Sequence, residues 1–178
     1  MTKTDPTYVK PFLRLMLFLF AFIMGIETGA ASFVTVVVFP LWASSAEAAR
    51  GWVPGMPYIL EEGDFFMYAS SLSMLASVIT LVAGWRAPAP LRKWILIATI
   101  GFIFVFVWSM LYFVPIQDTS FKGEAGAKFS TEELESKLKA FVNLNYVRLA
   151  MLYIILGAAL HALRLSYRMT SFTTDIKD

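Results

Sequence analysis

The sequence predicts an all-α integral membrane protein: a bundle of four transmembrane helices whose fourth helix extends beyond the bilayer. Hydrophobic residues make up 58% of the 178 residues, and the mean hydropathy is +0.65, which is too apolar for an ordinary soluble domain. Four apolar stretches are each long enough to cross a hydrocarbon core of about 30 Å. We expect one membrane domain with spans at about 12–39, 64–84, 91–114 and 143–165.

The first span, 12–39, follows Pro11, a residue that fits the first helical position because its missing N–H has no partner there. Pro40 is expected to end the span. Glu27 lies near the middle, between Gly25 and Gly29. This spacing of small residues predicts that another helix approaches the first one closely.

The second span, 64–84, follows an outer loop at 40–63 that is rich in proline, glycine and aromatic residues and is expected to be ordered at the membrane interface. Glu62 and Asp64 stand at the outer start of the span. Acidic residues at a helix N-terminus usually interact favourably with the helix dipole and with water. These two are also second-choice partners for a buried cation. Four small hydroxyl side chains recur at helical spacing and indicate either a packing face or the lining of a polar cavity: Ser70, Ser73, Ser77 and Thr80.

The third span, 91–114, follows a short rigid turn, and Pro115 is expected to end it. Its many aromatic side chains are typical of lipid-facing or core-filling positions. Trp108 and Tyr112 are one helical turn apart, so the alternative is that they stack on a planar apolar ligand.

The fourth helix begins with a capping-box motif, Ser130 to Glu133, and runs without an internal proline to Arg164 or beyond. Its first part is charged and belongs to the outer segment 115–142, whereas 143–165 is apolar enough to span the membrane. Arg148 lies within that apolar part. Two interpretations remain open: Arg148 is buried with a partner, or it reaches the lipid headgroups along its aliphatic stem.

Charge and residue types limit the function. Nine lysines and arginines flank the two ends of the chain and the short turn, against five on the other side, so both termini are predicted to be cytoplasmic. The net charge of +2 gives no basis for nucleic-acid binding. The absence of cysteine excludes disulfides and thiolate metal sites, and with only one histidine the sequence supports no metal or other cofactor.

Depth places two charged residues together. Counted from the cytoplasmic side at 1.5 Å per residue, Glu27 is about 22 Å deep and Arg148 about 24 Å. We therefore expect them to meet inside the bundle, either as an ion pair that fixes helix register or at the border of a ligand cavity open to the outer side.

Three short motifs resemble the anthrone oxygenase family, in particular its small bacterial members. These are Phe39-Pro40, Val114-Pro115-Ile116-Gln117 and Asn145-Tyr146-Val147-Arg148. The resemblance implies a four-helix membrane protein, in a bacterial inner membrane, related to fungal enzymes that oxidise anthrones to anthraquinones without a known metal or flavin.

Two hypotheses follow for function. In the first, an outer-half pocket binds an apolar aromatic or quinone-like molecule and acts as a cofactor-independent monooxygenase, with Glu27 as base and Arg148 stabilising the anion. Trp108, Tyr112, Gln117 and Asn145 would line that pocket. In the second, the chain is a non-catalytic membrane subunit or scaffold that forms a homo-oligomer or binds a partner membrane protein.

Overall fold

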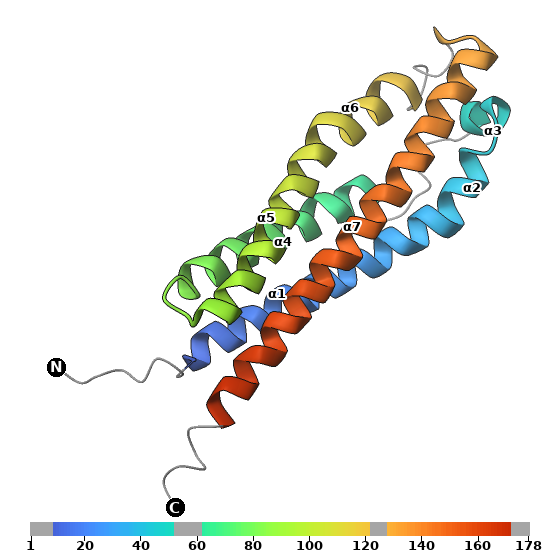
Figure 1. Cartoon of the computed structure of the whole chain (residues 1–178). Helices are drawn as coiled ribbons and strands as arrows, with labels where there is room; N and C mark the ends of the chain where they lie inside the picture. Colours follow the sequence, from blue (N-terminus) through green and yellow to red (C-terminus); the bar gives the residue numbers. More distant parts are fainter. Residues whose placement is uncertain (1–8, 52–61, 122–127, 172–178) are drawn as a thin grey trace, which may run out of the picture.

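The structure, a computed structural model, describes residues 9–51, 62–121 and 128–171, and every regular element in these ranges is helical (Figure 1). Four stretches are long and apolar enough to cross a membrane, which confirms the predicted all-α fold with four spanning helices: Pro11–Leu41, Gly63–Ala83, Ala89–Ile116 and Thr131–Met169. The α-helices are α1 Pro11–Phe33, α2 Phe39–Trp42, α3 Ala46–Gly51, α4 Glu62–Ala83, α5 Ala89–Trp108, α6 Val114–Ile116 and α7 Thr131–Ser171. Three segments are π-helical: η1 Val34–Val38, η2 Ser109–Phe113 and η3 Gln117–Phe121.

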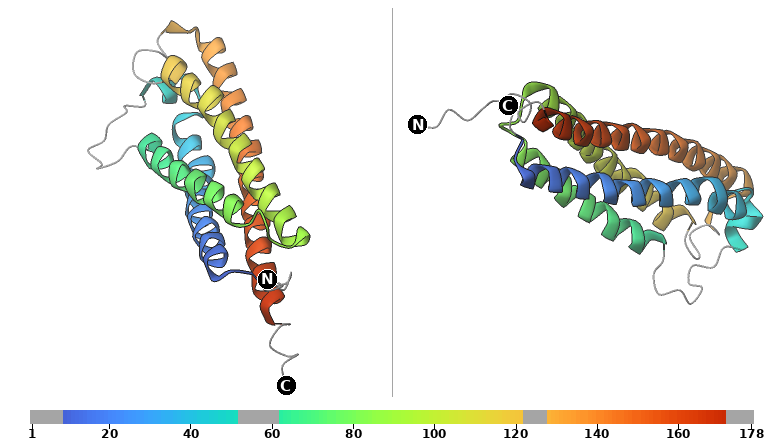
Figure 2. Two further views of the ribbon diagram at one scale, coloured as in Figure 1. Left: turned by 90° about the vertical axis from the view of Figure 1, so that its left-hand side faces the viewer. Right: turned by 90° about the horizontal axis from the view of Figure 1, so that it is seen from below.

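The long helices form a ring in which α7 packs on α1 and α5, and α4 packs on the same two helices from the other side. Figures 1 and 2 show that α1 begins at the end of the bundle where α7 finishes and where a turn joins α4 to α5. We call this the terminal end. The opposite end, which carries α2, α3 and the start of α7, is the loop end.

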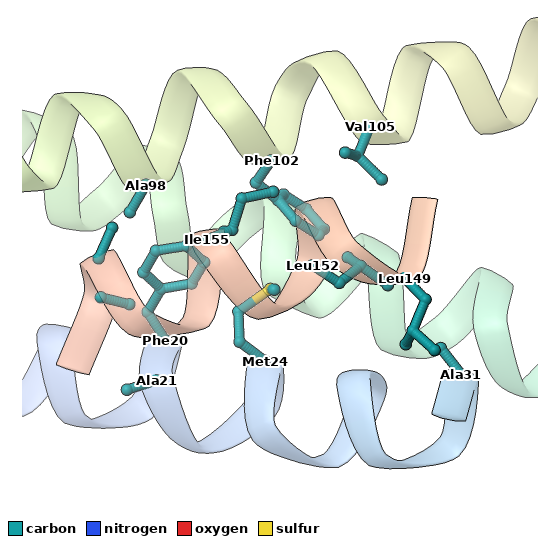
Figure 3. Packing of buried hydrophobic residues seen from close by; sticks show 12 residues of the cluster. Phe20, Ala21, Met24, Ala31, Ala98, Phe102, Val105, Leu149, Leu152 and Ile155 are labelled. Atoms are coloured by element: carbon teal, nitrogen blue, oxygen red, sulfur yellow. The ribbon is translucent and has the colours of Figure 1, made fainter. Parts of the chain in front are cut away.

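The bundle interior is filled by large apolar side chains along its whole length. In its central part, Phe20 and Met24 of α1 meet Phe102 of α5 and the apolar face of α7 (Figure 3). Phe20 and Phe102 pack edge to face with ring centroids 6.3 Å apart. Because lipid is as apolar as these side chains, close packing rather than removal from water holds such helices together.

Both prolines that were expected to end spans lie inside continuing helices, so this expectation is wrong. Pro40 belongs to α2, which follows η1, and Pro115 belongs to α6, which follows η2. Proline removes one backbone donor and clashes with the preceding turn of an α-helix. Here each proline follows a wider π-helical turn, closed by Phe39 N–H on the Val34 carbonyl and Val114 N–H on the Ser109 carbonyl. A wider turn of this kind lets the helix continue through the proline.

The expected close approach at Gly25 and Gly29 is also wrong. A Cβ atom added at either glycine would meet nothing within 4 Å. The buried face of α1 is the one that carries Met24, Glu27 and Thr28, so the two glycines lie off the packing face. Close approach occurs instead at Gly101 of α5, where an added Cβ would lie 3.0 Å from Ile155 Cγ1.

The predicted capping box at the start of α7 is confirmed. Ser130 N–H donates to Glu133 Oε2 at 3.1 Å, and Glu133 N–H donates to Ser130 Oγ at 3.2 Å. The helix that follows has 41 residues. It is therefore about 62 Å long at 1.5 Å per residue, roughly twice the hydrocarbon thickness, in agreement with its predicted extension beyond the bilayer.

The loop end is held together by contacts between segments far apart in the sequence. Arg50 of α3 donates to the Phe129 carbonyl at 3.1 Å and to Thr131 Oγ1 at 3.4 Å. Ala46 and Ala49 of α3 join the apolar cluster that contains Leu134 and Leu138 of α7. The outer loop 40–63 was predicted to be ordered, but 52–61 lie outside the described residues, as do 122–127 in the other outer segment.

Candidate functional site

Glu27 is buried in the bundle and hydrogen-bonded by two serines. Its side chain is only 4% exposed. Ser70 Oγ donates to Oε1 at 2.5 Å, and Ser73 Oγ donates to Oε2 at 2.8 Å. The two serines are three residues apart and hence on one face of α4, which faces α1. Each carboxylate oxygen thus has one donor from the protein.

Arg148 projects from α7 toward the same region. Its guanidinium carbon lies 4.6 Å from the centroid of the Phe113 ring, a cation–π contact between α7 and η2. Glu27 and Arg148 line one cavity. Their similar depth was predicted from residue counts on antiparallel helices.

The expected direct ion pair is not formed. Within the described ranges, no salt bridge joins Glu27 to Arg148: the carboxylate is held by Ser70 and Ser73, and the guanidinium lies over Phe113. The physical reason is that α4 supplies hydroxyl donors to Glu27 from one side, while α7 presents Arg148 from another. The two groups therefore share a cavity without neutralising each other by contact.

The cavity has a volume of about 90 Å³ and lies between the long helices toward the loop end. Ala31, Val105 and Leu152, at the loop-end side of the central core, form part of its wall (Figure 3). Phe39, Phe113 and Phe141 also line it, and Phe39 and Phe113 each pack edge to face on Phe141. This space holds several water molecules but is well below the roughly 300 Å³ of a site that encloses a drug-sized ligand.

Asn145 supplies a fixed hydrogen-bond acceptor on the cavity wall. Its side chain is 1% exposed, and its Nδ2 donates to the Phe141 carbonyl at 2.9 Å. Because that bond requires the N–H₂ group, the amide orientation is set, and Oδ1 is left as a buried acceptor without a partner in the described structure. A buried acceptor of this kind favours a ligand or water that brings a donor.

The other residues predicted for the site are distributed differently. Gln117, at the start of η3, lines the cavity. Trp108 and Tyr112 do not line it; both pack on the Phe113 ring, with centroid distances of 5.3 and 5.0 Å. Asp64 is exposed and lies outside the cavity wall. Glu62 begins α4, and its side chain lies outside the described residues.

Trp108 and Tyr112 lie on the helix face next to the one that lines the cavity. The cavity-lining residues on this side recur every four positions: Val105, Ser109, Phe113 and Gln117. Trp108 and Tyr112 each precede one of these residues by one position, so they have the same spacing on a neighbouring face. Helical spacing alone could not show which of the two faces points into the bundle.

Sequence reasoning missed Ser70 and Ser73 as partners of Glu27. The signal was present, because both belong to the hydroxyl stripe on the second span. That stripe was interpreted either as a packing face or as a cavity lining, and both apply: Ser73 and Ser77 are buried, while Ser70 lines the cavity. What the sequence lacked was the order of the helices, which brings the stripe to Glu27.

Fold and site together define an integral membrane protein of four helices with a charged, aromatic-lined cavity between them. The chain belongs to the anthrone oxygenase family. The sequence model of that family matches residues 56–160, which is more than half of the chain. Gln117, Asn145 and Arg148 lie inside the matched region, and Glu27 lies before it. No curated protein and no solved structure gave a significant match.

Proposed function

We propose that this protein binds an apolar aromatic or quinone-like molecule at the cavity and oxidises it with dioxygen, without a cofactor. The observation that carries the proposal is a carboxylate and a guanidinium that line one cavity and are not bonded to each other. Membership of the anthrone oxygenase family supports oxygenase-type chemistry. The cavity takes the acidic edge of the ligand rather than the whole molecule, because its volume is small.

In this reaction Glu27 is the general base and Arg148 stabilises the anion. The carboxylate removes a proton from an acidic phenol or from the methylene carbon of an anthrone, and the charge spreads over the ring and its oxygen, where Arg148 lies. The carbanion donates an electron pair to dioxygen and forms a C–O bond, and Glu27 returns the proton to give a hydroperoxide. Loss of water leaves the carbonyl. The sum is R₂CH₂ + O₂ → R₂C=O + H₂O.

The cavity surroundings suit this chemistry. The apolar aromatic wall excludes bulk water and strengthens the attraction between Arg148 and a developing anion. Ser70 and Ser73 orient the carboxylate, and the free Oδ1 of Asn145 can accept a hydrogen bond from a ligand hydroxyl. Gln117 adds a polar group to the cavity wall.

The test uses the full-length protein in lipid nanodiscs with anthrone as the probe, measuring quinone absorbance and oxygen consumption. We expect one oxygen consumed per quinone formed, above the rate without protein. Glu27→Gln should lower the rate by about 10²- to 10⁴-fold, the usual contribution of a positioned base. Arg148→Met should lower it by about 10²-fold or more, as for removal of an anion-stabilising donor.

Matched controls are Glu135→Gln and Arg164→Met, because both residues are exposed on α7 and remote from the cavity wall. Full turnover in Glu27→Gln would overturn the proposal. The alternative is a non-catalytic subunit or scaffold, in a homo-oligomer or with a partner membrane protein. A stable co-purifying partner, together with no quinone above background for the wild type, would favour it.

We further propose that the protein resides in the bacterial inner membrane, with the terminal end of the bundle facing the cytoplasm. The distribution of lysine and arginine supports this orientation. The cavity then lies in the outer half of the bilayer.

A further inference from the structure

The cavity reaches the outside of the bundle between α4 and the η2–α6 segment. Met67 of α4 and Val114 of α6 line the cavity and are nevertheless 45% and 36% exposed. Gly63 and Met110, each four residues before Met67 and Val114 respectively, also line it. We define these four residues as the rim: Gly63, Met67, Met110 and Val114.

The rim follows from the way the helices pack. A short turn joins the end of α4 to the start of α5, so the two helices are close together at the terminal end. Toward the loop end, α4 and the continuous α5–α6 segment diverge (Figure 2, left). The side of the opening opposite α4 is formed by η2 and α6, which contain Met110 and Val114. Where the two helices diverge, the cavity wall becomes the outer surface.

The chemistry of the rim matches the bilayer rather than water. All four rim residues are uncharged, and three of them have apolar side chains while the fourth is glycine. They lie within the stretches apolar enough to span a membrane. Leu72 and Leu111 on the neighbouring surface are 55% and 75% exposed, so the opening is set in a lipid-facing wall.

We propose that the rim is a lateral portal through which the apolar ligand passes from the bilayer to Glu27 and Arg148. This inference rests on the proposed function for the class of ligand. The acidic edge of the ligand lies in the cavity, and its remaining rings lie between Met67 and Val114. This arrangement also explains how a cavity of about 90 Å³ serves a multi-ring ligand.

The test measures binding without turnover. The probe is 2-hydroxyanthraquinone, a tricyclic phenol with no oxidisable methylene, added to full-length protein in phosphatidylcholine vesicles and followed by quenching of tryptophan fluorescence. The rim variants are Met67→Phe and Val114→Phe. The matched controls, Leu72→Phe and Leu111→Phe, place the same phenyl ring on the lipid-facing surface outside the cavity wall.

We expect each rim variant to slow association by about tenfold, while the controls keep the wild-type rate. Association at the wild-type rate in both rim variants would overturn the portal. If the wild type does not oxidise anthrone but the rim variants still slow probe association, the proposed reaction fails and the portal stands. If oxidation persists and the rim variants bind normally, only the portal fails.

A second measurement covers the case in which the rim variants do not fold. The chain contains no cysteine, so Met67→Cys with Val114→Cys can be joined by a flexible bis-maleimide. The control pair, Ser32→Cys with Tyr153→Cys, joins α1 to α7 at side chains whose oxygens lie 2.9 Å apart. Cross-linking should slow or abolish probe binding only in the rim pair; equal binding in both cross-linked pairs would overturn the portal.

Discussion

At the scale of residues, the protein keeps a carboxylate and a guanidinium in one cavity without joining them. A buried charge without partners costs several kcal/mol, so each must be compensated by its surroundings. Glu27 receives two serine hydroxyls, and Arg148 receives the face of Phe113. Neither compensation joins the two charges to each other, and both residues line the cavity.

The serine donors are the first prediction at this scale. Ser73→Ala should destabilise the protein by about 1–3 kcal/mol, because it removes a buried hydrogen bond to a charged acceptor. The matched control is Ser77→Ala, since Ser77 is equally buried but donates to the Met74 carbonyl of its own helix. Unfolding free energies in detergent would be compared. In a Glu27→Met background the cost of Ser73→Ala should vanish, and an unchanged cost there would show that the serine acts elsewhere.

The coupling of Glu27 and Arg148 is the second prediction. Removing one member of a contacting buried ion pair costs about 3–5 kcal/mol. Because no salt bridge joins these two residues in the described structure, we expect a double-mutant cycle of Glu27→Gln and Arg148→Met to give a smaller coupling, about 1 kcal/mol. The unfolding free energies of the four proteins measure it. A coupling above about 3 kcal/mol would mean that the side chains contact directly.

The site was predictable from the sequence only in part. Residue counts from the helix ends place Glu27 and Arg148 at one depth, and both line the cavity with Gln117 and Asn145. Trp108 and Tyr112 were selected because they are one turn apart, but the neighbouring face with Ser109 and Phe113 is the one that lines the cavity. Asp64 was considered a second-choice partner for a buried cation because of its charge and depth, without knowledge of which side of α4 faces the interior.

At the scale of elements, two signals of equal strength in the sequence had different outcomes. The capping box at Ser130 depends only on residues within one turn, and it is formed as predicted. The prolines at 40 and 115 depend on what the preceding turn does, and the π-helical segments η1 and η2 carry the helix past them. A local rule therefore predicts a helix start more reliably than a helix end next to proline.

The capping box gives the third prediction. Ser130→Ala should destabilise the protein by about 1 kcal/mol, because it removes the acceptor for one unpaired N–H at the helix start. Ser136→Ala is the control, because this serine is exposed on the same helix and lies about two turns after the cap. Unfolding free energy and the helical signal in circular dichroism would be measured. Equal stability of the two variants would show that Arg50 and the α3 contacts hold the helix start without the cap.

At the scale of the whole molecule, four apolar helices fix the protein in a bilayer, and the charges at their ends determine which way it faces. The number and class of the helices could be predicted from hydropathy, because each stretch must satisfy its backbone within itself. The ring order of the helices could not. It depends on which faces meet, and the small-residue spacing at Gly25 and Gly29 indicated a contact that the bundle does not make.

Orientation is the last prediction. Along the sequence, nine basic residues belong to the two ends of the chain and the short turn, against five in the outer segments, so the loop end is expected outside. A single cysteine reports the side of the membrane cleanly, because the natural chain has none. The cysteine must be placed at an exposed position of the loop end. Ser120 is buried there and would label poorly. Ser136 is suitable, because it is exposed on the part of α7 that projects beyond the bilayer.

We therefore expect Ser136→Cys in intact cells to react with a membrane-impermeant maleimide. Ala89→Cys, at the exposed start of α5 on the terminal end, should react only after the membrane is opened. Both variants replace small exposed residues outside the cavity wall, so each should keep wild-type stability and serve as the control for the other. The reverse labelling pattern would place the termini outside and the cavity in the cytoplasmic half of the bilayer.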